Sequence, residues 1–317
     1  MTRFKNFANH QMNSLKQEIN SSYTELSLSK RKEDSLAELA NCKLCPRECG
    51  VNRLNDEKGV CNTGRFARVA SHNLHFGEEP PISGTKGSGT IFFAYCNLKC
   101  AFCQNYPISQ LGNGEITPPE KLARMMISLQ KRGAHNINLV TASHVVPQFI
   151  EALHIAASDG LKIPIVYNTS GYDGMKSLKL LDGIVDIYMP DIKYSDDRTA
   201  MKYSSAPKYW EIATKAVREM YRQVGNMITD DEDIAKKGLL IRHLVLPDNL
   251  SGSEKVFEFI ASEISRDVPV NLMSQYFPAN KGVSDPVIGR RVNKEEFCKA
   301  EKLLKKFGLE NGWIQRL

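Results

Sequence analysis

The chain has 317 residues, of which 42% are hydrophobic and 25% are charged, as is typical of a globular protein with one large domain and a smaller appendage. Its net charge of +6 favours an anionic ligand, but it lacks the dense basic stripe of a nucleic-acid-binding protein, so we do not expect a nucleic-acid partner. No apolar stretch is long enough to cross a membrane, and residues 1–20 lack the apolar centre of a signal peptide. These features predict a cytoplasmic protein without a membrane partner.

Residues 1–41 are polar and contain neither glycine nor proline. The segment KRKEDSLAELANC (30–42) indicates a short helix that leads directly to Cys42. We expect residues 1–41 to form an N-terminal extension whose tip is partly mobile.

Residues 42–89 combine four cysteines with many turn-forming residues. Two, three and eleven residues separate Cys42, Cys45, Cys49 and Cys61. In a reducing compartment four such thiols predict a closed metal site, filled by zinc or by an iron–sulfur cluster, and the mixed spacing favours iron–sulfur. We expect the metal to organise a cysteine-rich lobe whose apolar core is too small to fold alone.

Two adjacent acidic residues, Glu78 and Glu79, lie in the segment HNLHFGEEPPISG (72–84) that joins the lobe to the rest of the chain. Carboxylates at this place could reach the mouth of the next domain and contact a substrate. Solvated carboxylates are the commoner outcome in such a loop, so we predict exposed side chains and keep both residues as substrate-side candidates.

Strand and helix patterns alternate from residue 90 onward. Short β-branched runs predict strands at 90–95, 136–141, 163–169, 185–194, 239–247 and 268–277. Helical patterns fill the intervals at 118–133, 145–160, 175–183, 209–225, 253–264 and 294–309. Six strand–helix units in succession indicate a parallel α/β architecture.

Polar residues stand at the carboxyl ends of several of these strands, where a (β/α) barrel carries its active site. No Gly-x-Gly-x-x-Gly follows a strand, so a dinucleotide-binding fold is not supported. The predicted fold class is α/β, with a partial (β/α)6 TIM-like barrel at 90–317 preceded by the cysteine-rich metal-binding lobe at 42–89. An acidic stretch before the fifth strand (225–238) is predicted to be a solvated loop or a lid.

Three more cysteines follow the first predicted strand, as Cys96, Cys100 and Cys103. Thiolates at this spacing can bind three corners of an iron–sulfur cluster, whereas a structural zinc site needs a fourth protein ligand. An iron without a protein ligand can bind an external chelator. The alternatives are three buried thiols, or a zinc ion that takes its fourth ligand from elsewhere in the chain.

The Cys-x3-Cys-x2-Cys loop, with Phe102 before its last cysteine, resembles that of the radical S-adenosylmethionine (SAM) superfamily. Further segments are similar to the branch of the pyruvate formate-lyase activating enzymes and their PflX-like relatives, and these segments are GSGTIFFAYCNLKCAFCQNYPIS, YNTSGYD, MPDIKY, IRHLVLP and NLMSQYFP. The resemblance implies a [4Fe-4S] cluster whose open iron binds SAM. One electron, from a donor such as flavodoxin or ferredoxin, would then cleave SAM to a 5′-deoxyadenosyl radical that abstracts hydrogen from a substrate.

The resemblance also implies residues that contact SAM. Asp191 and Lys193 match an Asp-x-Lys contact of the relatives, and strand alternation places them above the apolar Ile187 and Met189 on one face. Further candidates are Phe102 beside the adenine, Thr141 and Ser143 where many relatives carry a Gly-Gly-Glu-Pro-like segment, Asn168 near the ribose, and Gln275 at the last strand. The glutamate of that segment is absent here. On the fifth strand, Arg242 and His243 have equally apolar neighbours, so the pattern does not decide which one faces the site.

The sequence leaves three functional hypotheses. The leading one is a radical SAM oxidoreductase that acts on a backbone glycine of a partner protein, as a glycyl-radical-enzyme activase does. The second is a radical SAM enzyme that acts on a small molecule or an RNA base. The third is a non-catalytic iron–sulfur or zinc protein that uses the barrel as a binding scaffold.

Overall fold

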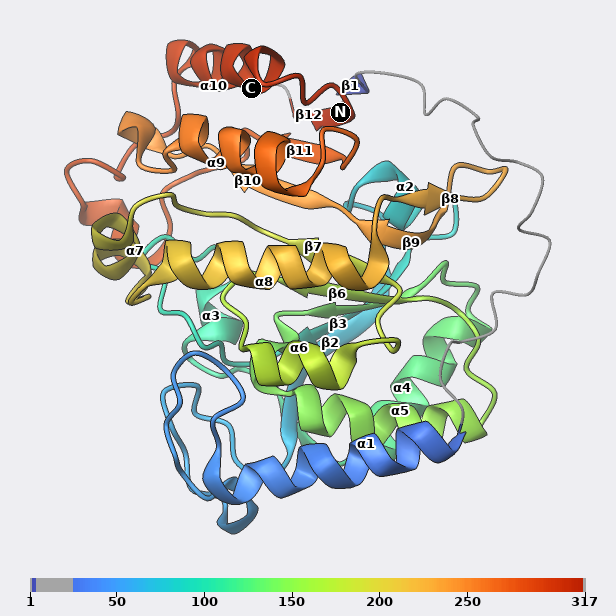
Figure 1. Ribbon diagram of the computed structural model, residues 1–317. Helices are drawn as coiled ribbons and strands as arrows, with labels where there is room; N and C mark the ends of the chain where they lie inside the picture. Colours follow the sequence, from blue (N-terminus) through green and yellow to red (C-terminus); the bar gives the residue numbers. More distant parts are fainter. Residues whose placement is uncertain (1, 4–24, 316–317) are drawn as a thin grey trace.

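Six parallel strands form the centre of the protein, as the sequence predicts (Figure 1). The computed structural model describes residues 2–3 and 25–315. The strands are β3 (Ser88–Phe93), β5 (Ile137–Val140), β6 (Ile165–Thr169), β7 (Ile187–Pro190), β10 (Ile241–Leu244) and β11 (Val270–Met273). A backbone bridge between Asp191 and Arg242 connects β7 to β10, so the two sheets of the molecule join into one curved array. This array is a partial barrel, and the carboxyl ends of its strands meet at one mouth.

The helices that follow these strands in the chain cover the outer face of the array (Figure 1). They are α4 (Pro119–Lys131), α5 (Val146–Ser158), α6 (Met175–Leu181), α7 (Asp197–Ser204), α8 (Tyr209–Val224), α9 (Ser253–Phe259) and α10 (Lys294–Lys306). Proline in the first turn begins α4 and α5, and Gly225, with φ of +67°, ends α8. The apolar faces of these helices and of the strands pack into one continuous core.

Apolar side chains fill the end of the barrel opposite the mouth. Val166, Ile187 and Met189 form a cluster with Ile82 and Trp313, which come from outside the six strands. The predicted apolar layer below Asp191 and Lys193 is therefore present. The charged residues above it are held on a packed and rigid base.

The segment after the cysteine-rich region differs from the prediction. Residues Ala67–His75 form β2, which pairs antiparallel with β3 and with β4 (Glu115–Thr117). The predicted lobe boundary at residue 89 therefore falls inside the main sheet. The acidic stretch also differs, because β8 (Ile228–Thr229) and β9 (Ala235–Leu239) form an antiparallel pair there. This pair precedes the amino end of β10, away from the mouth, so it is not a lid.

The N-terminal extension contains the predicted helix, α1 (Glu25–Ala37), which packs on α5 and continues into a short 3-10 turn. Leu28 is fully buried, and Arg31 donates to the carbonyl oxygens of Leu180 and Asp182 beside α6. The extension is thus docked on the barrel along this helix. Its predicted mobile tip lies outside the described residues.

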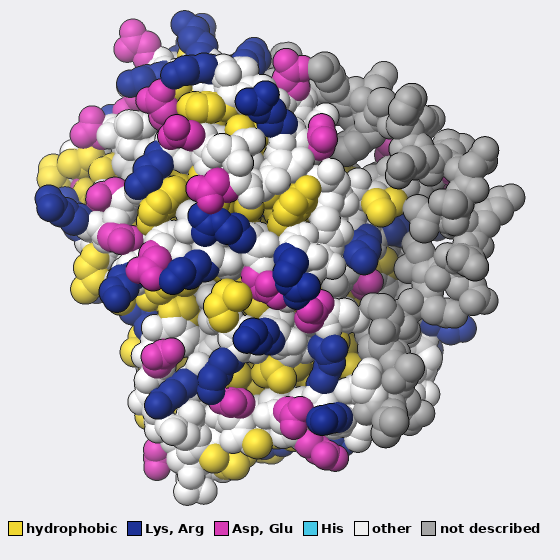
Figure 2. Space-filling model, viewed as in Figure 1, with side chains coloured by type: hydrophobic (Ala, Val, Ile, Leu, Met, Phe, Trp, Pro, Cys, Tyr) yellow, Lys and Arg dark blue, Asp and Glu magenta, His cyan; other side chains and the backbone are white. Residues whose placement is uncertain are grey.

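On the face shown in Figure 2, basic and acidic side chains interleave over α6 and α8. Several are paired, such as Arg222 with Asp182 and Lys215 with Glu211. This face carries no continuous stripe of one charge. Among the described residues, the helices are all too short or too polar for a membrane span.

Candidate functional site

A cavity of about 360 Å³ opens at the carboxyl ends of the barrel strands. Its volume lies within the range of roughly 300–1,000 Å³ that small-molecule sites occupy. The cavity is lined by the three-cysteine loop and by charged and polar residues at the strand ends. The lining includes Glu78, Cys96, Cys100, Phe102, Cys103, Thr141, Asn168, Asp191, Lys193, Arg242 and Gln275. Most of the predicted site residues therefore converge on one place.

The three-cysteine loop begins where β3 ends and is fixed by the carboxyl end of α7. The amide groups of Lys99 and Ala101 donate to the carbonyl oxygens of Ser204 and Tyr203, at 3.0 and 2.7 Å. These backbone bonds hold the turn on which Cys100 stands. The loop is therefore a rigid support for the thiols rather than a free segment.

Each of the three thiols also has a hydrogen-bonding neighbour. The Leu98 amide donates to Cys96 Sγ at 3.3 Å, the Ser204 hydroxyl donates to Cys100 Sγ at 3.0 Å, and Ser109 Oγ lies 3.1 Å from Cys103 Sγ. Burial, together with the neighbouring Cys100 and Cys103, raises the pKa of Cys96 to about 12. As thiolates these three groups would repel one another, and a cationic metal group would remove that repulsion, so the thiols and their N–H and O–H donors fit such a group.

Asp191 and Lys193 stand at the end of β7 and form an ion pair, with Nζ and Oδ2 at 2.5 Å. Arg242 Nε contacts the other oxygen of Asp191 at 2.7 Å. Burial alone would raise the pKa of Asp191, but the two cations outweigh burial and lower the pKa below its ordinary value. Lys193 and Cys100 line the same cavity, and the Lys193 ammonium group opposes the rise that burial causes in the pKa of Cys100.

Arg242 faces the cavity, which settles the choice that the sequence left open. Its guanidinium contacts Asp191, Asn168 at 2.7 Å and Glu78 at 3.3 Å. His243 points to the outer face, where its ring nitrogens contact the Ile192 carbonyl and the Ser253 hydroxyl, and it is fully buried. His243 is therefore a structural residue in the strand–helix layer.

Glu79 is buried and the side chain of Glu78 is only 11% exposed, so the prediction of exposed loop carboxylates is wrong. Glu78 lines the cavity and accepts hydrogen bonds from Asn138 and Arg242. Glu79 is 2% exposed and accepts from Asn271 at 2.6 Å. Burial raises the pKa of both carboxyl groups, and Arg242 opposes this rise. The loop that carries them folds into the barrel, so that Glu78 lines the mouth cavity and Glu79 is buried outside that cavity.

The remaining candidates divide into those that face the cavity and one that does not. Phe102, Thr141, Asn168 and Gln275 line it. Ser143 is buried behind it, with its hydroxyl 3.0 Å from that of Thr169. The left-handed backbone at Thr141, with φ of +62°, turns the chain so that Ser143 leaves the mouth. The structure therefore does not support a cofactor contact by Ser143.

Gly171 permits the close approach of the YNTSG turn to the end of β7. Its φ is +75°, and a Cβ atom there would lie 2.6 Å from the Asp191 carbonyl oxygen. We expect Gly171→Ala to destabilise the protein by about 1–3 kcal/mol, since alanine would meet both the left-handed strain and this contact. Denaturant unfolding measures the loss, with Gly160→Ala as the control, because Gly160 has φ of +88° but no atom within 4 Å of such a Cβ. An equal loss of unfolding free energy in both variants would show that the contact with the Asp191 carbonyl does not contribute to the destabilisation.

The other four cysteines surround a second and much smaller cavity, of about 10 Å³. This cavity is lined by Cys42, Cys45, Cys49 and Cys61 together with Arg53 and His144. It lies behind the loop that follows β5. The two cysteine sets are therefore separate sites.

Comparison with known proteins identifies this arrangement. A family model described as the Radical SAM superfamily matches residues 90–230. Over 278 residues the chain is 32% identical to "Uncharacterized protein MJ0674" of Methanocaldococcus jannaschii, covering 85% of this chain and 76% of that protein. Over 263 residues it is 24% identical to "Uncharacterized protein MJ0808" of the same organism, covering 76% and 71%.

A solved structure supports the fold. The chain is similar to Streptococcus suis SuiB bound to S-adenosylmethionine, with a TM-score of 0.50 and 12% identity. The similarity covers 70% of this chain and 48% of SuiB, so the chain spans about half of that protein. The family match covers the strands that carry the three-cysteine loop and the Asp191–Lys193 pair. The chain belongs to the radical SAM superfamily, whose enzymes use a [4Fe-4S] cluster and S-adenosylmethionine.

Proposed function

We propose that Cys96, Cys100 and Cys103 bind a [4Fe-4S] cluster and that the rest of the mouth cavity binds SAM and a substrate. The observation that carries the proposal is that these three thiols share one cavity with the half-buried Asp191–Lys193–Arg242 group. Three thiolates leave one iron of a cubane open for a chelating ligand. Together, the cluster and SAM supply one-electron cleavage of a sulfonium bond and abstraction of a hydrogen atom.

The donor set of the cavity fits SAM. Lys193 uses one of its three ammonium N–H donors on Asp191, which leaves donors for the SAM carboxylate beside Cys100. Ser170 lines the cavity, and its buried hydroxyl has no hydrogen-bond partner among the described residues, so it can bind a ligand. Phe102 and Gln275 offer an apolar wall and an amide for the adenosine. These residues bind and orient the cofactor, and the packed barrel below excludes water from it.

Asp191 holds Lys193 in place, which gives a first test. We expect Asp191→Ala to weaken SAM binding by about 10- to 100-fold, the range for losing one charge-assisted hydrogen bond. The iron content should stay unchanged, because Asp191 does not touch the thiols. Equilibrium binding of SAM to the anaerobically reconstituted protein measures the effect, with Asp182→Ala, at the surface pair with Arg222, as the control. Unchanged affinity in Asp191→Ala would remove this residue from the site.

For the substrate, we propose a glycine of a partner protein, as in the activating enzymes that the sequence resembles. The inside of the mouth also supports a second candidate, a small polar molecule. Glu78 and Arg242 present half-buried charged groups there and Asn168 presents a buried amide, and such groups recognise polar ligands rather than a bare backbone methylene.

Isotope transfer distinguishes the two candidates. Deuterated extract of the source cells is separated by ultrafiltration into macromolecules and small molecules, and each fraction is incubated with the reduced enzyme and SAM. The activase proposal predicts deuterium in 5′-deoxyadenosine only with the macromolecules, together with a glycine-centred radical in the electron paramagnetic resonance (EPR) spectrum. Deuterium transfer from the small-molecule fraction alone would overturn it in favour of a small polar substrate.

A further inference from the structure

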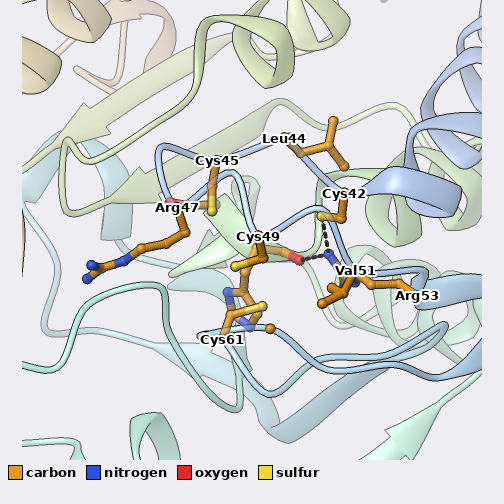
Figure 3. A pocket seen from close by; sticks show the side chains of 11 residues that line it. Cys42, Leu44, Cys45, Arg47, Cys49, Val51, Arg53 and Cys61 are labelled. Atoms are coloured by element: carbon orange, nitrogen blue, oxygen red, sulfur yellow. Dashed lines mark hydrogen bonds between the residues drawn. The ribbon is translucent and has the colours of Figure 1, made fainter.

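The four cysteines of the N-terminal lobe face one another although their sequence positions span twenty residues (Figure 3). Their sulfur atoms surround one small space. The loop is held tightly, since the Cys42 amide donates to the Val51 carbonyl and the Gly50 amide donates to the Cys42 carbonyl. Cys49 Sγ also accepts from the Val60 amide at 3.4 Å. The backbone thus directs four thiols toward one space, beside a small apolar cluster of Leu39, Cys42 and Leu44.

Arg53 places a buried positive charge beside this space. The residue is 2% exposed, and its Nη1 lies 3.7 Å from Cys42 Sγ. Its Nη2 has no hydrogen-bond partner, and no ion pair with a carboxylate is found for it among residues 25–315. An uncompensated buried cation costs several kcal/mol. An anionic group at the thiols would compensate both the charge and the free donor.

We propose that Cys42, Cys45, Cys49 and Cys61 bind a closed metal centre, and that the loop carrying this centre braces the cavity at the barrel mouth. Binding converts four thiols to thiolates and releases four protons to the solvent. A zinc ion with four thiolates carries a charge of about −2, as does an oxidised [4Fe-4S] cluster with four thiolates, so either offsets Arg53.

The two metals make different geometric demands. In the described part of the chain, no three Cys, His, Asp or Glu side chains are close enough together to hold a single ion. A zinc ion therefore requires the thiols to rotate inward, whereas a cluster requires them to remain apart and the cavity to widen. The zinc ion and the iron–sulfur cluster would both be bound by four thiolates, and metal analysis distinguishes between them.

The brace consists of two arginines that connect the lobe to the loops of the mouth. Arg47 lies between Cys45 and Cys49, and its guanidinium points away from the thiols (Figure 3). Its Nε donates to the Asn97 carbonyl, next to Cys96, at 2.8 Å, and its guanidinium lies 5.3 Å from the centre of the Tyr172 ring.

Arg53 Nη1 donates to the His144 carbonyl at 3.0 Å, in the loop after β5. The lobe also contacts α6, because the Ser177 hydroxyl donates to the Leu44 carbonyl at 2.8 Å. A metal that fixes the cysteine loop therefore also fixes the start of the three-cysteine loop and the turn behind Thr141.

Metal analysis tests the centre independently of catalysis. Wild type, Cys45→Ser/Cys61→Ser and the control Cys298→Ser are purified anaerobically, and zinc, iron and sulfide are measured per chain. We expect the double variant alone to lose about one zinc, or about four irons with their sulfide. Metal contents equal to wild type in the double variant would overturn the centre.

Alkylation of the folded wild type keeps this test valid if the double variant does not fold. Cys45 and Cys49 are half-buried and should react with iodoacetamide only after a chelator removes the metal, whereas Cys298 should react equally with and without the chelator. Equal labelling of Cys45 and Cys49 in both conditions would contradict metal binding.

The variant Arg47→Met tests the brace. This part of the inference rests on the proposed function, because the brace is expected to act on the cluster at Cys96. The control Arg65→Met removes an arginine that pairs with Glu151. We expect Arg47→Met to keep the four-thiolate metal but to release cluster iron to a chelator about 10- to 100-fold faster, as changes around metal ligands do, with an altered EPR spectrum. Release and spectrum equal to the control would overturn the brace, even if wild type proves unable to cleave SAM.

Discussion

Replacing Cys100 with alanine is expected to abolish cleavage of SAM by the reconstituted protein. Two thiolates cannot hold three corners of a cubane, so the cluster at the barrel mouth should be lost or converted to a smaller form. The fall in 5′-deoxyadenosine formation should exceed the roughly 100-fold that changes around metal ligands cause, because here a ligand itself is removed.

The measurement compares 5′-deoxyadenosine and iron content in Cys100→Ala with those in Cys298→Ala. Cys298 lies on α10, far along the chain from both cysteine sets, and its replacement should leave both quantities at the wild-type level. Substantial 5′-deoxyadenosine formation by Cys100→Ala would place the cluster elsewhere.

Replacing Arg242 with glutamine is expected to destabilise the fold more than other changes at the mouth. Arg242 is the shared cation of Asp191 and Glu78, and burial makes each unpaired carboxylate costly. Removing one partner of a buried ion pair costs about 3–5 kcal/mol, a large part of the roughly 5–15 kcal/mol that stabilises a domain. Asp191 keeps Lys193 as its partner in this variant. The loss of stability therefore comes mainly from Glu78 and from Glu79 below it, which lose their neighbouring cation.

The pH dependence of this loss follows from the raised pKa values of Glu78 and Glu79. A carboxyl group whose pKa is higher in the folded than in the unfolded state destabilises the fold as pH rises through that pKa. Without Arg242 the two pKa values should rise further. The destabilisation by Arg242→Gln should therefore be smaller at about pH 5.5 than at about pH 8, since protonation removes the unpaired charge.

Denaturant unfolding of the metal-free protein at both pH values measures the effect. The control is Arg218→Gln, which breaks a surface pair with Glu263 and should cost at most about 1 kcal/mol at either pH. A loss in Arg242→Gln that is no larger than the control, or that grows at low pH, would contradict the described charge network.

The sequence was sufficient for the parts of the fold that depend on local pattern. Short β-branched runs and amphipathic patterns predicted all six barrel strands and the main helix after each of them, since each is buried against the same core, but they did not predict the short helix α7. The strand β2 was missed because its burial is irregular after Val69 and it follows a segment dominated by cysteines. The three-cysteine loop could be predicted as a cluster site because the spacing of its ligands is a local property of the sequence.

The residues that sequence reasoning placed wrongly depend on distant contacts. Glu78 and Glu79 lie in a loop that contains proline and glycine, and their partners are distant in sequence: Asn138 and Arg242 for Glu78, and Asn271 for Glu79. The choice between Arg242 and His243 depended on which way the array curves. Ser143 left the mouth because of one left-handed residue, Thr141, which no periodicity reveals.

The central claim is that the three thiols and the charged strand ends form one SAM-cleaving site. Its most direct test is anaerobic reconstitution with iron and sulfide, followed by reduction in the presence of SAM and measurement of 5′-deoxyadenosine and methionine. The proposed site predicts equal amounts of the two products, and none without reductant or in Cys100→Ala. An intact, reduced cluster that forms no 5′-deoxyadenosine from SAM would contradict it.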